Sequence, residues 1–142
     1  MGLQRMLAGC WSSTFRRLRR CALDASPLEW RAMIAGVAEP ALLRDPAQAA
    51  DALDLHYSAL VFLRRLPAEV RHNDDVRALR KALGYSVSVV AAALPAPGLA
   101  QMRAWALWHD PDVDWLLREN LKKRRLAAWP DALDTIRAAL DS

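Results

Sequence analysis

Apolar residues recur at helical spacing between residues 74 and 94, and this pattern constrains the fold of the chain more than any other. Six of them follow one another at intervals of three or four residues: Val76, Leu79, Leu83, Val87, Val90 and Leu94. That spacing places them on one face of an α-helix. The valines near position 89 would also suit a strand, but they continue the stripe in helical phase. The sequence therefore predicts a long amphipathic helix behind a cap at residues 73–75, where carboxylates favour the positive end of the helix dipole.

The same order of cap, apolar face and short connector recurs along most of the chain. Ser26, Asp45 and Asp110 each precede a proline, so a capping side chain stands before a residue that suits the first helical turn. The expected apolar faces include Leu28 in the first of these helices and Tyr57 in the second. After the N-terminal segment, helices are predicted over residues 27–37, 46–66, 74–94, 98–108, 111–126 and 130–141.

These patterns predict an all-α protein with about seven helices and no strand. The length of 142 residues fits one domain, 1–142, with a single core. Two pairs of segments, 47–66 with 74–94 and 98–108 with 111–126, are expected to form helical hairpins. Stacked hairpins cover one another's apolar faces, which makes a short right-handed α-solenoid. The helix at 130–141 is expected to cap its C-terminal end.

Positive charge is concentrated at the N-terminus. The chain has a net charge of +4, and residues 1–23 hold five arginines and no acidic residue: Arg5, Arg16, Arg17, Arg19 and Arg20. The rest of the chain has 15 basic and 16 acidic residues, so a uniformly basic nucleic-acid-binding surface is not indicated. Residues 1–23 are expected to form a helix with Met6, Leu7 and Cys10 among its inward residues. A basic tail and a mitochondrial-type presequence are the alternatives.

The two cysteines and the length of the apolar runs bear on the compartment. Cys10 and Cys21 on one continuous helix would lie about 16 Å apart along its axis, too far for a disulfide. Unpaired thiols suit a reducing cytoplasm, so a cytoplasmic location is expected. The longest apolar runs are shorter than the ~20 residues that span a bilayer, so no membrane span is expected.

Two segments resemble a known family. The sequences LRKALGYSVSV (residues 79–89) and DPDVDWLLRENLKKRRL (residues 110–126) resemble the closing repeats of HEAT-repeat proteins, and the resemblance covers roughly residues 47–126. It implies an α-solenoid that presents a surface to other macromolecules. The chain is then expected to be the closing end of a longer repeat protein.

HEAT repeats often carry an aspartate in the turn and an arginine in the second helix, and these residues form a polar ladder. By this resemblance, Asp110 and Asp112 suit the role of the turn aspartate. Asp114 stands roughly where the arginine would be expected, so the chain departs from the pattern at that position. Arg118, four residues later, is placed to pair with Asp114 on the helix surface.

The candidate binding residues lie in and just before the segment 111–126. Residues 122–125 place four cations in the expected last turn, which suits the helix dipole and is usually a solvated helix end. Together with Arg118 they would alternatively form an anion-binding patch. Four tryptophans lie within 25 residues, of which at least two are expected in the core, with Trp108 or Trp115 as an exposed anchor. The candidate set is Trp108, Trp115, Arg118, Lys122, Lys123, Arg124 and Arg125.

Other polar residues are interpreted as structural. Asn120 falls on the buried stripe of its helix, where its amide needs hydrogen-bond partners from backbone groups of the adjoining turn. Gly84 belongs to a small-residue patch, with Ser86 and Ser88, that suits close helix packing. Asp110 is interpreted as a helix cap, because Trp115 and Leu121 stand where a calcium loop needs glycine and glutamate.

No metal, cofactor or catalytic residue is expected. His56, His72 and His109 are scattered and have no zinc-ligand spacing, so they are interpreted as surface or half-buried side chains. No residue constellation indicates a reaction. The leading hypothesis is a non-enzymatic HEAT-type scaffold with a protein partner. The alternative is a nucleic-acid-binding HEAT-like solenoid related to DNA-alkylation-repair proteins, although no motif transfers their catalytic residues to this chain.

Overall fold

The computed structural model describes residues 2–142, and all regular secondary structure in that range is helical. The α-helices are α1 (Gly2–Gly9), α2 (Trp11–Ala22), α3 (Pro27–Val37), α4 (Pro46–Arg65), α5 (Asp74–Ala93), α6 (Pro95–Ala106), α7 (Pro111–Leu121) and α8 (Pro130–Asp141). Three short 3-10 helices lie between them: η1 (Leu42–Arg44), η2 (Ala68–Val70) and η3 (Arg124–Leu126). The all-α prediction is confirmed for the described residues, with eight α-helices there rather than about seven.

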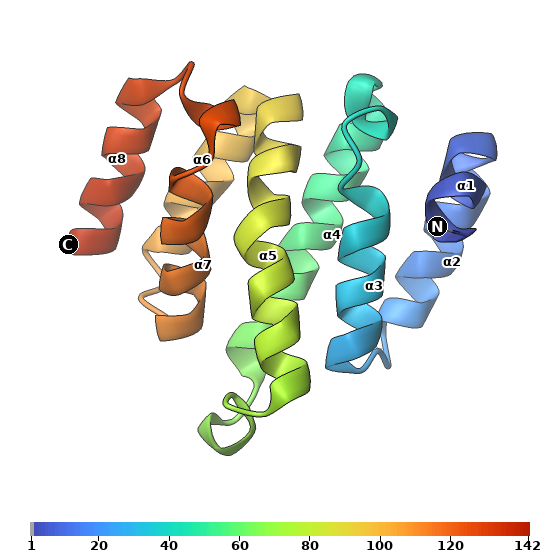
Figure 1. The fold of residues 1–142 in the computed structure, drawn as a ribbon, viewed down its shortest axis with the longest axis horizontal. Coiled ribbons are helices and arrows are strands. Elements are labelled where there is room, and N and C mark those ends of the chain that lie inside the picture. The colour runs from blue at the N-terminus through green and yellow to red at the C-terminus, as the bar shows by residue number, and fades with distance from the viewer. Residues whose placement is uncertain (1) are drawn as a thin grey trace.

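The helices alternate between two layers. Helices α1, α3, α5 and α7 lie side by side in chain order, and each contacts the next. On the other side, α2 contacts α4 and α6 contacts α8. Figure 1 shows α5 near the middle of the molecule and the two ends of the chain at opposite sides. Both predicted pairs, α4 with α5 and α6 with α7, are in contact.

Helix starts follow the predicted chemistry. The Ser26 hydroxyl accepts a hydrogen bond from the Glu29 N–H, and the Glu29 carboxylate accepts one from the Ser26 N–H, which makes a capping box. The Asp45 and Asp110 side chains also cap their helices. The Asn73 side chain makes no capping bond, although α5 begins directly after it.

Helix α6 begins earlier than predicted. Residues 95–98 were expected to break the chain, but they form the first turn of α6 directly after Leu94. Prolines suit a first turn because their missing N–H groups need no helical partner there. A Cβ atom on Gly98 would lie 2.7 Å from the Ala91 Cα, so the glycine lets α6 cross α5 closely.

The core confirms the α5 stripe and corrects the predicted faces of two other helices, α4 and α3. Five of the six predicted stripe residues are buried, and Leu94 is half-buried. Helix α4 buries a face that does not include Tyr57, which is 44% exposed. That face combines three alanines with three leucines: Ala49, Ala52, Ala59, Leu55, Leu60 and Leu63. Small side chains let helices approach closely, which outweighs the larger apolar area of a tyrosine. In α3, Trp30 is buried and Leu28 is exposed.

The basic N-terminal segment is helical but divided at Cys10. The N–H of Cys10 bonds to the Met6 carbonyl, and α2 then starts at Trp11. The division changes the phase, so Leu7 is buried as predicted, whereas Met6 and Cys10 are exposed. Cys10 and Cys21 are free thiols. Helix α1 packs against α3, and Trp11 of α2 donates a hydrogen bond to Asp51 of α4.

Candidate binding site

Two sets of polar contacts join α7 to the preceding hairpin. The first is an ion-pair network in the turns. Asp110 accepts the N–H groups of Asp112 and Val113, and its Oδ2 lies 2.7 Å from Arg71 Nη1. Asp112 pairs with Arg80 at 3.0 Å and with Arg71 at 3.3 Å. Burial alone would lower the pKa of Arg71, but the hydrogen bonds and charges of the two aspartates raise it above its ordinary value.

The second set is centred on Asn120, which has no exposed surface. Its Oδ1 accepts the Ser88 N–H at 2.7 Å. Its Nδ2 donates to the carbonyls of Leu83 at 2.9 Å and Leu116 at 2.6 Å. The amide therefore bonds to the backbone of α5 and of its own helix, rather than to the adjoining turn. It joins the two helices through a satisfied buried group.

Between α5 and α7 runs a groove of about 410 Å³, which we call the α5–α7 groove. Four cations line it: Arg77, Arg80, Lys81 and Lys123. The other lining residues are two aromatic rings, one glycine and one carboxylate: Tyr85, Trp115, Gly84 and Glu119. A Cβ on Gly84 would lie 3.3 Å from the Trp115 ring, so the absent side chain makes room for the indole.

The two aromatic rings of the groove are partly exposed and carry cations on their faces. Trp115 is 38% exposed and Tyr85 is 50% exposed. The guanidinium of Arg80 lies 4.5 Å from the Trp115 ring centroid, and that of Arg125 lies 4.7 Å from the Tyr85 centroid. Lys123 Nζ is 5.6 Å from the same tyrosine ring, and Arg125 also donates to the Tyr85 hydroxyl at 3.0 Å. These contacts hold the charges at defined places on the surface.

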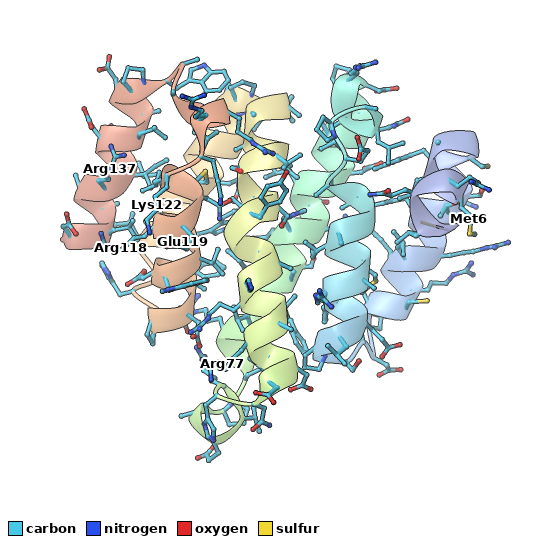
Figure 2. The ribbon with its side chains drawn as sticks, viewed as in Figure 1. Met6, Arg77, Arg118, Glu119, Lys122 and Arg137 are labelled. Atoms are coloured by element: carbon cyan, nitrogen blue, oxygen red, sulfur yellow. The ribbon has the colours of Figure 1, made fainter. Side chains whose placement is uncertain are left out.

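The structure brings together only part of the predicted binding set. Trp115 and Lys123 line the groove, and Arg125 lies on its tyrosine. Lys122, directly after the end of α7, pairs with Glu119 at 2.6 Å; Figure 2 labels both residues beside this helix and Arg77 near the start of α5. Arg124 is exposed in η3 and makes no ion pair within residues 2–142.

Two predicted residues lie elsewhere. Arg118 does not pair with Asp114 but reaches Asp141 of α8 at 2.8 Å. The pKa of Asp114 is raised by burial, against the opposing charges of His109 and Arg118. Trp108 is half-buried against Tyr57, with Arg64 4.6 Å above its ring. Among the four clustered tryptophans only Trp105 is fully buried.

The four cations at 122–125 do not form the last turn of a helix. Helix α7 ends at Leu121, and the N–H groups of Lys122 and Lys123 bond three residues back, to Glu119 and Asn120. This tightened turn lets the chain leave the helix and bury Leu126 completely. The cations are therefore directed by the turn and η3, which brings Lys123 and Arg125 to Tyr85.

Sequence reasoning missed the part of the groove contributed by α5. Arg77, Lys81 and Tyr85 follow one another at intervals of four residues, so they form a stripe on the side of the helix away from the buried one. That spacing was a usable signal. The total charge of the segment conceals this stripe, because acidic residues at the start of α5 offset its cations.

His56 is a buried side chain rather than a surface or half-buried one. Its Nδ1 lies 2.7 Å from the Ala52 carbonyl, so this nitrogen carries the proton, and Nε2 accepts the Ser86 hydroxyl at 2.9 Å. Burial lowers its pKa to about 4. A serine next to a histidine is the geometry of an activated nucleophile. Here both side chains are at most 2% exposed, and the pair joins α4 to α5 inside the core.

Searches for other kinds of site and for relatives add no assignment. Residues 2–142 contain no cluster of three or more side chains suited to holding a metal ion. Among the same residues, no helix combines the length and the apolar character that a membrane crossing requires. No protein-family model matches the sequence, and no curated protein or solved structure matches it.

Proposed function

We propose that this chain is a HEAT-type α-solenoid module that binds another macromolecule through the α5–α7 groove and catalyses no reaction itself. The row formed by α1, α3, α5 and α7 supports the solenoid part, since stacking of hairpins places alternate helices next to one another. Asp110 and Asp112 in one turn pair with Arg71 and Arg80 of the preceding hairpin. That pairing is the kind of aspartate–arginine ladder that the resemblance implies.

The observation that carries the binding role is the pair of partly exposed rings in the groove. Aromatic side chains and arginine are the residues that contribute most to binding free energy at protein surfaces. Trp115 and Tyr85 project from helices that Asn120 and the ion-pair network join rigidly. A surface that is already ordered loses little conformational entropy when a partner binds.

The sequence offers two partner classes, a protein and a nucleic acid, and the lining of the groove bears on the choice between them. The groove favours a partner with negative charge, because its lining has four cations and one carboxylate. The interleaving of cations with rings is the specific feature that favours the nucleic-acid candidate.

An affinity capture experiment tests the proposed binding face. The full chain is immobilised and exposed to native lysate, with and without nuclease, next to two variants. Lys81→Glu/Lys123→Glu reverses charge in the groove, whereas Arg16→Glu/Arg17→Glu reverses the same number of charges on exposed positions of α2. We expect the groove variant to lose the captured macromolecule and the α2 variant to retain it. Equal capture by all three proteins contradicts the proposal.

A further inference from the structure

We propose that the macromolecule bound at this face is a single-stranded nucleic acid, whose phosphates contact the groove cations and whose bases stack at Tyr85 and Trp115. This inference rests on the proposed function, because it takes the α5–α7 groove as the binding surface. It goes further by selecting one partner class.

The α5–α7 groove is one part of a longer hollowed surface. A second hollow lies between α3 and α5, and it shares Tyr85 with the groove. A third lies beside η1 and the end of α5, shares Pro40 with the second, and is lined by the Arg125 that stacks on Tyr85. Neighbouring helices pack about 8–10 Å apart, so a surface crossing α3, α5 and α7 spans about 20 Å. An extended strand of a few nucleotides has that length.

The charge of this surface differs from that of the chain as a whole. The three hollows are lined by seven cations and two carboxylates, Glu39 and Glu119. Of the cations, Arg77, Lys81 and Lys123 make no ion pair within residues 2–142. Their charges are therefore available to an incoming anion. The segment from Asp24 onward is nearly neutral in sum, yet seven of its 15 basic residues line these three hollows with only two carboxylates.

The exposed rings distinguish a nucleic acid from an acidic peptide. Carboxylates would satisfy the cations but leave the apolar surface of Trp115 and Tyr85 in water. Unpaired bases satisfy both, because they stack on aromatic rings and on guanidinium planes while the backbone follows the positive groove. The guanidinium groups of Arg80 and Arg125 already lie over these rings, one at each ring.

The same rings distinguish a single strand from a duplex. In a duplex each base is covered by its neighbours, so a surface ring reaches a base only after that base has been turned out of the stack. Binding of a duplex would therefore depend on contacts between its phosphates and the groove cations alone. A single strand presents its bases without that cost.

The test is fluorescence anisotropy with the purified full chain and three labelled probes. These are an oligothymidylate of about ten nucleotides, a duplex of the same length, and an oligoglutamate peptide, each at low salt. We expect the single strand to bind most tightly. The slope of log K against log salt should be about −2 to −3, which corresponds to three or four phosphate contacts.

Variants locate the binding. Lys81→Glu/Lys123→Glu should weaken single-strand binding about tenfold or more and flatten the salt slope, whereas the matched Arg16→Glu/Arg17→Glu control should change it less than about twofold. Trp115→Ala should weaken binding about 5- to 30-fold. Because Trp115 also packs at Gly84, Tyr85 gives an independent reading: Tyr85→Phe should retain binding and Tyr85→Ser should weaken it. Thermal unfolding confirms that each variant is folded.

Several results overturn the inference. They are no single-strand binding at low salt, equal or tighter binding of the duplex or the peptide, and loss of binding in the α2 control instead of the groove variant. Failure here is separable from failure of the proposed function. Nuclease-resistant capture that still depends on Lys81 and Lys123 would leave the binding face in place with a protein partner. Capture that ignores both residues would remove the binding face as well.

Discussion

The two basic regions of this molecule are built in different ways. Helix α2 has the higher local density of arginines, but they are exposed, and the one ion pair there, Arg19 with Asp54, joins side chains that are 44% and 67% exposed. In the α5–α7 groove, Arg80 lies over the Trp115 ring and joins the partly buried ion-pair network, and Lys123 and Arg125 lie over the Tyr85 ring. Density of charge along a sequence is therefore a poor guide to where charge is held in place.

The largest expected effect is at the buried amide that fixes the groove. Replacing Asn120→Leu removes three hydrogen bonds and leaves the Ser88 N–H and the Leu83 carbonyl without the amide partner. We expect the free energy of unfolding to fall by about 3–4 kcal/mol, measured by urea denaturation. Arg20→Ala on exposed α2 is the control and should change it by less than about 0.5 kcal/mol. A loss of less than about 1 kcal/mol for the Asn120 variant would show that these three hydrogen bonds are dispensable for stability.

The second effect is the pH dependence of stability that arises from the buried His56 of α4. His56 has a folded pKa of about 4 against an ordinary value of 6.5, so the folded protein favours the neutral ring. Its contribution to stability is complete above pH 6.5 and is lost as the pH falls toward 4, because the unfolded chain takes up the proton first. The loss amounts to about 3 kcal/mol at most. Urea denaturation at pH 7.5 and 4.5 should show a smaller pH dependence for His56→Gln than for the unmodified chain. Parallel pH profiles of the two proteins would contradict this assignment.

A third prediction concerns the partly buried ion pair. Asp110→Ala removes a helix cap and also leaves Arg71, whose side chain is 18% exposed, without its closest carboxylate. The expected loss of unfolding free energy is about 2 kcal/mol. A double-mutant cycle with Arg71→Met measures how much of that loss is pairwise coupling. Additive single effects would show that the two side chains act independently.

The smallest effect is expected at the exposed pair of the N-terminal region. Although Arg19 and Asp54 are only 2.6 Å apart, both side chains stay in water. A double-mutant cycle with Arg19→Ala and Asp54→Ala should give a coupling below about 0.5 kcal/mol, and added salt should reduce it further. A coupling as large as that of Arg71 with Asp110 would remove the distinction between the two regions.

What the sequence predicts well in this molecule is local. The apolar stripe that begins at Val76 and the caps at Ser26 and Asp110 depend on neighbours within a turn. The buried face and the helix starts can therefore be predicted from residue spacing alone. The buried face of α4 cannot be predicted from spacing alone, because its alanines are buried where another helix approaches closely and not because of their own apolar area. The end of α7 is linked to the burial of Leu126, and no capping residue in the sequence marks that end.

The candidate site lies further beyond local pattern. Tyr85 and Arg125 are 40 residues apart in the chain but share a hydrogen bond, and Trp115 reaches the groove because Gly84 lacks a side chain. Such contacts arise only once α5 and α7 are placed next to each other. The charge of segment 122–125 is visible in the sequence, and two of its residues, Lys123 and Arg125, lie at the groove. The α5 residues opposite this segment, Arg77, Lys81 and Tyr85, were not predicted, because the apolar stripe dominates the sequence pattern of that helix.

The absence of a loop between α5 and α6 has a practical consequence for anyone who cuts or splices this chain. Leu94 is the sole residue between the two helices, and Gly98 sits against the Ala91 backbone within one turn of that corner. A protease needs several residues of slack chain to bind, and an inserted peptide needs open space at its two ends. This corner offers neither, so digestion should spare it and grafts placed there should prevent folding.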